Sequence, residues 1–407
     1  METNRRILPS MLLLLLSLSG FLISGSAAAA LTIGLIFFDI AVSPSETLTF
    51  ISIAALASLT AFLQIPAFIN AIRDLQKKDS SPRHASLYKP ASYSMILWLC
   101  VMAAGYFISR SEANWLLLAP LTVLGIAIPV WWLIEFGRRK LPRSTGLREW
   151  GSLSVGLTAA PVIIMVVEIL LIVLICIILI FALSTQSGFM QELSDIFQDL
   201  DLTQGDLESL EELLLQLAQN PILASTLLLV IGFIAPFIEE FFKPMVIWFL
   251  LRHPIKPHEG FSLGMISGGA FALLESAGLV SQIGPVDWLS AIFLRAATGI
   301  LHIGLSGFVG YGFSKAWSEK RYSRVVIYLL IATGLHGAWN ALALINGYST
   351  SLLPAAQQSA LPAITSILTI ALMIVVFFTV IYITLRTNHR LRLELQAQTV
   401  ENASPNQ

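Results

Sequence analysis

The chain has 407 residues, of which 56% are hydrophobic and only 12% are charged. An average soluble domain has about 25% charged residues, so this composition excludes a water-soluble fold and predicts a protein with several membrane-spanning helices. The 24 Lys and Arg residues are balanced by 25 Asp and Glu residues, which argues against nucleic-acid binding.

Ten apolar stretches are long enough to cross a bilayer as helices, since a span needs about 20 apolar residues. The sequence therefore predicts an all-α, polytopic transmembrane helix bundle of about ten helices. The stretches cover residues 8–38, 47–71, 91–108, 114–136, 152–184, 221–250, 261–283, 288–313, 325–346 and 360–385.

The basic residues set the expected orientation of this bundle. If the amino terminus is cytoplasmic, 21 of the 24 Lys and Arg residues fall in cytoplasmic segments, and only Arg110 lies outside. The other two basic residues, Lys243 and Arg295, lie within predicted spans. Because cytoplasmic loops carry an excess of basic residues, we expect both termini in the cytoplasm.

The first apolar stretch allows two interpretations. Residues 7–38 contain no charge, and the small residues from Ser26 to Ala30 resemble a signal-peptidase site. The apolar run continues through Leu31–Phe38, which favours a retained, long or broken first helix. The topology of the later spans is the same in both cases.

The predicted loop 185–220 holds eight acidic side chains and no basic one, and its apolar residues recur at helical spacing. We expect two amphipathic helices on the extracytoplasmic side, acting as a packing collar or connector rather than as a lid or docking surface. This loop separates the expected parts of the chain. They are an N-terminal five-helix bundle (1–184), the acidic loop (185–220), a four-helix core (221–346), a last span (347–386) and a polar cytoplasmic tail (387–407).

Ionisable residues at bilayer depth are costly and usually mark function or a buried polar network. Seven of the eight clear cases lie between residues 239 and 336, so any chemistry is expected in the C-terminal half of the chain. The eight are Glu168, Glu239, Glu240, Lys243, Glu275, Arg295, His302 and His336.

The sixth predicted span carries two adjacent glutamates and a lysine. Lys243 follows Glu239 by four residues and Glu240 by three, so it can reach either carboxylate on a helix. Pro236 and Pro244 remove backbone donors around this segment, which predicts a helix opened beside the carboxylates. The alternative is a buried Glu–Lys pair that only stabilises the bundle.

The next three spans add further polar residues at helical spacing. Gly264, Gly268, Ala272 and Ser276 form a small-residue face for close helix contact, and Glu275 borders it one turn after Phe271. Arg295 and His302 share one face of the eighth span, and His336 and Asn340 share one face of the ninth.

The depth of these residues provides an independent test of convergence. At 1.5 Å per residue, Glu239, Glu240, His302 and His336 all lie about 16–18 Å from the predicted cytoplasmic helix ends. Glu275 and Asn340 lie about 21–22 Å deep by the same count. Polar groups from four helices thus fall in one layer, which predicts one shared site and leaves Glu168 outside it.

These motifs resemble those of the PrsW family of intramembrane proteases, which is similar to the wider superfamily of CAAX-type membrane endopeptidases. The resemblance covers residues from about 225 to 345. It lies in Glu239-Glu240-Phe241-Phe242-Lys243, Phe271-Ala272-Leu273-Leu274-Glu275, His302 and His336-Gly337-Ala338-Trp339-Asn340. The sequence departs from the family in Ser276, where relatives often have Asn, and in Asn340, where many have Asp.

Two mechanisms are open for peptide hydrolysis at such a site. In the first, Glu239 or Glu240 is the general base, tuned by Lys243, while His302 helps to hold the water. His336 and Asn340 then donate hydrogen bonds to the oxyanion. In the second, His302, His336 and a glutamate, Glu240, bind zinc. Glu275 belongs to the expected catalytic set in both.

The leading functional hypothesis is an intramembrane endopeptidase that cuts a membrane-anchored protein or peptide within the lipid bilayer. The resemblance implies that a regulatory, anti-sigma-like factor is one possible class of substrate. The alternatives are a proton-coupled transporter and a non-catalytic membrane scaffold that uses the same polar cluster. No inverted repeat supports the transporter. We expect no nucleic-acid partner, and zinc is the only cofactor considered.

Overall fold

A computed structural model gives the arrangement of most of the chain. In the part that it describes, the chain forms helices and no strand, which confirms the all-α class. The described residues are 2–38, 40, 43–78, 86–111, 114–184, 221–250, 255–280, 287–351 and 361–403.

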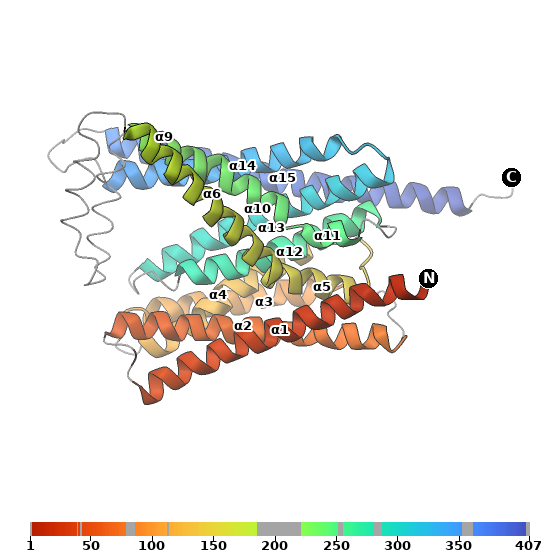
Figure 1. Cartoon of the computed structure of the whole chain (residues 1–407), viewed down its shortest axis with the longest axis horizontal. Coiled ribbons are helices and arrows are strands. Elements are labelled where there is room, and N and C mark those ends of the chain that lie inside the picture. The colour runs from red at the N-terminus through yellow and green to blue at the C-terminus, as the bar shows by residue number, and fades with distance from the viewer. Residues whose placement is uncertain are drawn as a thin grey trace. The chain divides into compact units, whose positions relative to one another are not determined.

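Ten helical stretches among these residues are long and apolar enough to cross a membrane, which confirms the predicted count. The helices are labelled in Figure 1. They are α1 (Glu2–Phe37), α2 (Pro44–Leu75), α3 (Tyr88–Ile108), α4 (Asn114–Gly137), α5 (Gly146–Leu157), α6 (Ala159–Leu183), α9 (Pro221–Leu229), the π-helical segment η1 (Val230–Ile234), α10 (Ala235–Phe242), α11 (Met245–Leu250), α12 (Pro257–Val280), α13 (Trp288–Ser318), α14 (Arg324–Ser351) and α15 (Leu361–Ala403).

Some helices differ from the expected spans. The fifth span is divided at Thr158 into α5 and α6, because Pro161 has no N–H to donate to the carbonyl of Leu157. The last helix, α15, runs to Ala403, well beyond the expected end at residue 385. The first turns of this extension are anchored by Leu391, which is 2% exposed, and by buried Asn388.

Several sequence predictions are not tested by the structure. The loop 185–220 lies outside the described residues, so its helices and its side of the membrane stay predictions. The orientation of the termini, the retention of the first apolar stretch and the expected division of the chain into five parts also stay predictions.

The chain divides into two compact units. The first unit comprises residues 1–161, 240–332 and 377–407, and the second comprises 162–239 and 333–376. The chain passes from the second unit to the first between Glu239 and Glu240, in the middle of α10.

The first unit is built on closely packed helix pairs. The pairs α1–α2, α3–α4 and α12–α13 lie side by side, and α12 also packs against α5 and α4 (Figure 1). Added Cβ atoms at Gly264 and Gly268 would meet the backbone carbonyls of Ser306 and His302. The predicted small-residue face of α12 is therefore confirmed, and it brings α12 into close contact with α13.

Polar side chains tie α4 to its neighbours within the first unit. The indole N–H of Trp98 on α3 donates to the carbonyl of Gly125 at 2.8 Å. The indole N–H of Trp288 on α13 donates to the hydroxyl of Thr122 at 2.7 Å. Both tryptophans are buried, so their donors find partners inside the bundle, as buried indoles usually do.

The second unit contains most of α6, α9, η1 and parts of α10, α14 and α15. Here η1 and α14 approach closely, because a Cβ at Gly337 would collide with the carbonyl of Gly232. The hydroxyl of Thr369 on α15 donates to the side-chain oxygen of Asn346 on α14 at 3.1 Å. These contacts place His336 and Asn340 beside the segment that leads into α10.

Candidate functional site

The segment that carries the paired glutamates is irregular on both sides. The π-helical segment η1 precedes α10, and the helix stops at Phe242 before it restarts at Met245. Pro244 explains the interruption because it has no N–H, so the predicted opening of this helix is confirmed. The N–H of Ile247 donates to the carbonyl of Pro244 at 2.9 Å, which leaves the carbonyl of Lys243 without its helical donor.

The hydroxyl of Ser267 on α12 takes the place of that donor and hydrogen-bonds the carbonyl of Lys243. This contact fixes the break in the helix against α12. Sequence reasoning did not single out Ser267. Its only signal was its position beside Gly268 on the small-residue stretch of α12.

Lys243 lies at the centre of a fully buried polar cluster in the first unit. Its Nζ is 3.1 Å from Oε1 of Glu240, and both side chains are 0% exposed. The same Nζ is 2.6 Å from Nδ1 of His302 and 4.5 Å from the ring centre of Phe271. Lys243 thus contacts a carboxylate, an imidazole and an aromatic face, and of the two glutamates it pairs with Glu240.

His302 continues this cluster toward α12. Its Nε2 is 2.7 Å from Oε2 of Glu275, and the Glu275 carboxylate is 3.0 Å from Arg295. The Nε of Arg295 also donates to the hydroxyl of Ser276 at 3.1 Å. The ring of His302 therefore lies between the Lys243 amine at Nδ1 and the Glu275 carboxylate at Nε2.

Ser306 supports the other carboxylate of the cluster. It lies one turn after His302 on α13, and its hydroxyl is 3.5 Å from Oε2 of Glu240. Ser306 also faces Gly264 and Gly268 of α12. No sequence motif points to this residue, because a serine in a small-residue helix face usually serves only packing.

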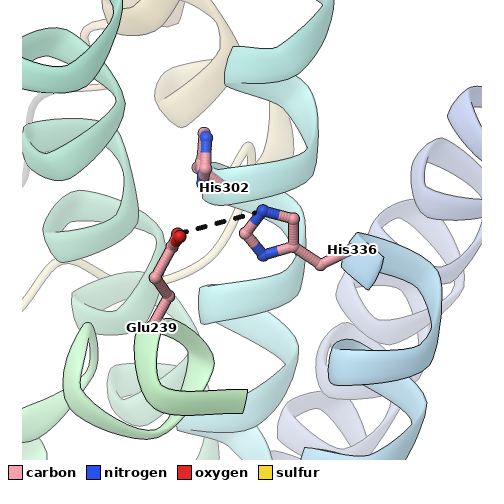
Figure 2. A group of neighbouring side chains, drawn as sticks. All are labelled: Glu239, His302 and His336. Carbon is pink, nitrogen blue, oxygen red and sulfur yellow. Dashed lines mark ion pairs between the residues drawn. The ribbon is translucent and has the colours of Figure 1, made fainter. Parts of the chain in front are cut away.

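In the second unit, Glu239 faces away from Glu240 and toward α14. Its Oε2 is 3.8 Å from Nε2 of His336, with side chains 12% and 2% exposed (Figure 2). Asn340 lies one turn after His336 and donates from Nδ2 to the carbonyl of Ile231 at 3.4 Å. Adjacent residues on a helix point about 100° apart, which explains why the two glutamates have different partners.

Glu239, His302 and His336 form a group that can hold a metal ion. Each offers one ligand atom, and these atoms all lie within 4.8 Å of one another (Figure 2). A carboxylate and two imidazoles are a known ligand set of catalytic zinc. The donor set therefore fits zinc, and its glutamate is Glu239, whereas the sequence analysis had placed Glu240 in that position.

The expected site residues are thus distributed as follows. Glu240, Lys243, Glu275 and His302 lie together in the first unit, joined by Arg295. Glu239, His336 and Asn340 lie in the second. Glu168 lies on α6 and is not a member of the metal-binding group.

Comparison with known proteins gives one match. Residues 205–383 match the model of the PrsW family intramembrane metalloprotease. The matched range contains all four motifs, so the resemblance predicted from the sequence is confirmed, and it supports an intramembrane protease. No curated protein and no solved structure gives a match.

Proposed function

We propose that this protein is an intramembrane endopeptidase that hydrolyses a peptide bond of a membrane-anchored protein, such as a regulatory factor. The observation that carries the proposal is the grouping of Glu239, His302 and His336 in a segment that matches an intramembrane metalloprotease family. A carboxylate and two histidines among membrane-spanning helices can bind and deprotonate a water molecule at a depth where bulk water is scarce.

Glu239, His302 and His336 are the proposed metal ligands, with zinc as the ion that suits them. When bound, zinc supplies a Lewis acid that lowers the pKa of water and polarises a carbonyl group. The side chain of Glu239 is 12% exposed, whereas that of Glu240 is 0% exposed. Glu239 is therefore the carboxylate of the pair that faces the reaction, and it is the general base if hydrolysis proceeds without metal.

The other polar residues position this group. Glu275 holds the Nε2 side of His302, in the way that carboxylates commonly orient metal-binding histidines. Lys243 occupies Nδ1 of the same ring and is itself held by Glu240. Lys243 and Glu275 thus hold the ring of His302 from its two sides.

Asn340 is proposed to stabilise the oxyanion together with His336. Its amide is one helical turn from His336 and makes a long hydrogen bond of 3.4 Å to the carbonyl of Ile231. A donor held this weakly can turn toward negative charge that develops on the substrate carbonyl.

Metal analysis of the purified protein, combined with a cleavage assay on a tagged single-span substrate, tests the proposal. We expect about one zinc per chain and loss of cleavage on chelation, with recovery when zinc is added back. Cleavage that survives complete removal of metal would assign the reaction to Glu239 alone. Absence of cleavage, together with counter-flow of a solute in proteoliposomes, would favour the transporter instead.

A further inference from the structure

A basic cavity lies at the end of the first unit where α3 begins and α4 ends. Its volume is about 630 Å³. The residues that line it are Ser86, Tyr88, Lys89, Arg139, Lys140 and Arg392. They come from the start of α3 and the residues just before it, from the turn after α4 and from the later part of α15, so three separate segments of the chain line one space.

Among the described residues, the lining contains four cations and no carboxylate. None of Lys89, Arg139, Lys140 and Arg392 has an acidic partner in the part of the chain that the structure describes. The neighbouring arginines behave differently, since Arg138 pairs with Glu135 and Glu149. The chain thus neutralises the adjacent charges and leaves those around the cavity available to an anion.

Contacts within the first unit fix the position of these cations. Asn388 on α15 donates to the carbonyls of Gly137 and Arg139, at 2.9 and 3.1 Å, which holds α15 against the end of α4. The guanidinium of Arg139 lies 4.6 Å from the ring centre of Phe136. The Nε of Arg392 is buried without a hydrogen-bond partner among the described residues, which is costly unless a ligand supplies an acceptor.

Lys140 adds a backbone feature at the same place. Its φ of 62° lies in the left-handed region, which costs a residue with a side chain about 1–2 kcal/mol relative to the usual conformation. Glycine would occupy this position after a helix without strain. The lysine therefore brings a charge to the mouth of the cavity at a conformational cost.

The outer face of α3 continues from the cavity as an apolar strip. Tyr93 and Ile96 follow Lys89 at helical spacing and are 69% and 63% exposed, and Leu97 beside them is also exposed. In a bilayer these side chains contact acyl chains. A soluble phosphate would use the cations alone, whereas a phospholipid would use both the cations and the apolar strip.

We propose that this cavity binds the phosphodiester headgroup of an anionic phospholipid, with its acyl chains along the exposed face of α3. Basic pockets between helix ends at a membrane surface are suited to such headgroups. The site is independent of the proposed protease chemistry, because none of its residues belongs to the candidate functional site.

Native mass spectrometry of the detergent-solubilised full chain tests the proposal, with phosphatidylglycerol and phosphatidylcholine of identical acyl chains as probes. We expect tighter retention of phosphatidylglycerol. The double variant Arg139→Gln/Arg392→Gln should weaken it about tenfold or more, because each basic residue contributes roughly a fivefold factor. Lys89→Gln alters one exposed side chain and should weaken binding about fivefold, which provides a second test if the double variant does not fold.

The matched control is Arg73→Gln/Lys78→Gln, which removes two exposed cations at the end of α2 and should retain phosphatidylglycerol like the wild type. Equal loss of binding in this control would overturn the site in favour of general surface charge. Unchanged binding in Lys89→Gln and the double variant would also overturn it. If glycerol phosphate, which lacks acyl chains, displaced the lipid at equal concentration, the ligand would be a soluble phosphate ester and the lipid proposal would fail.

Discussion

Two buried ionic clusters in the first unit use charge in different ways. The first, here called the junction cluster, consists of Glu135, Arg138, Arg143 and Glu149 between α4 and α5. The second is the lysine–histidine cluster around Lys243, described above. The junction cluster contains only carboxylates and guanidinium groups, whereas the other also contains an amine and an imidazole.

Every charge of the junction cluster has an opposite partner. Arg138 bonds Glu149 at 2.9 Å and also contacts Glu135, and Arg143 bonds Glu149 at 2.6 Å. Burial lowers the pKa of Arg143, but the hydrogen bond and charge of Glu149 and the charge of Glu135 outweigh it and hold the pKa above its ordinary value. Each carboxylate of this cluster is paired with a guanidinium group, so we expect the cluster to stabilise the fold.

The lysine–histidine cluster adds an imidazole to its paired charges. The two nitrogens of His302 face the Lys243 amine on one side and the Glu275 carboxylate on the other. An imidazole is also a metal ligand, which a guanidinium group is not. The comparison suggests that removal of charge should affect stability in the junction cluster and activity in the other, which leads to the following predictions.

The largest effect is expected at the proposed metal ligands. Glu239→Ala, His302→Ala and His336→Ala should each lower cleavage by at least about 10³-fold and abolish stoichiometric zinc, because the three act as one unit. For the same reason, a Glu239/His302 double variant should be little worse than either single one. Glu168→Ala is the control and should keep its activity and zinc. Full activity in Glu239→Ala would remove this carboxylate from the mechanism.

The second prediction concerns the junction cluster. Arg138→Met leaves Glu135 and Glu149 buried without the guanidinium group that pairs with both of them. It should therefore lower the free energy of unfolding by about 3–5 kcal/mol. Thermal melting in detergent measures the loss, while cleavage per folded molecule should stay near the wild-type value. Arg390→Met removes an exposed i,i+4 pair with Glu394 and should change stability by only about 0.5 kcal/mol. Equal melting temperatures of the Arg138→Met and Arg390→Met variants would show that the junction cluster has no special structural role.

The fold was largely predictable because membrane spans are encoded locally. A window of apolar residues fixes each span whatever surrounds it, and all ten were predicted. The division at Thr158 was not foreseen, although Pro161 stood in the sequence as its cause. The extension of α15 beyond residue 385 contacts the end of α4 through Asn388, and such a contact between distant segments leaves no local pattern.

The candidate site was predictable in its members but not in its pairings. Equal depth placed Glu239, Glu240, His302 and His336 in one layer. The partner of each glutamate depends on the rotation of α10 about its axis, which depth and spacing do not determine. Arg295 was recognised as an intramembrane charge, but its contact with Glu275 requires the close approach of α12 and α13.

The third prediction tests that contact. Arg295→Gln removes the cation that holds Glu275 and should lower zinc affinity or kcat by about 10–100-fold, as loss of outer-shell partners commonly does. Arg295→Lys keeps the charge but not the hydrogen bond to Ser276, and should recover part of the loss. Zinc affinity and the pH profile of cleavage are the measurements that distinguish positioning of His302 from simple stability. Wild-type zinc affinity and kcat in Arg295→Gln would contradict the positioning role.

The smallest effect is expected at the helix break beside the lysine–histidine cluster. Ser267→Ala removes the hydroxyl that hydrogen-bonds the carbonyl of Lys243. That carbonyl has lost its helical donor, since the N–H of Ile247 bonds Pro244 instead. The substitution should therefore cost about 1 kcal/mol of stability and lower the melting temperature by about 2 °C.

Ser262→Ala is the matched control for this last substitution. Ser262 is also buried on α12, 2% exposed, but its hydroxyl has no hydrogen-bond partner among the described residues. Its loss should be neutral or slightly stabilising, because a buried polar group without a partner is unfavourable. Cleavage should fall only in Ser267→Ala, since only there can Lys243 shift relative to His302. Identical melting and activity of the two variants would mean that the helix break holds Lys243 in place without help from α12.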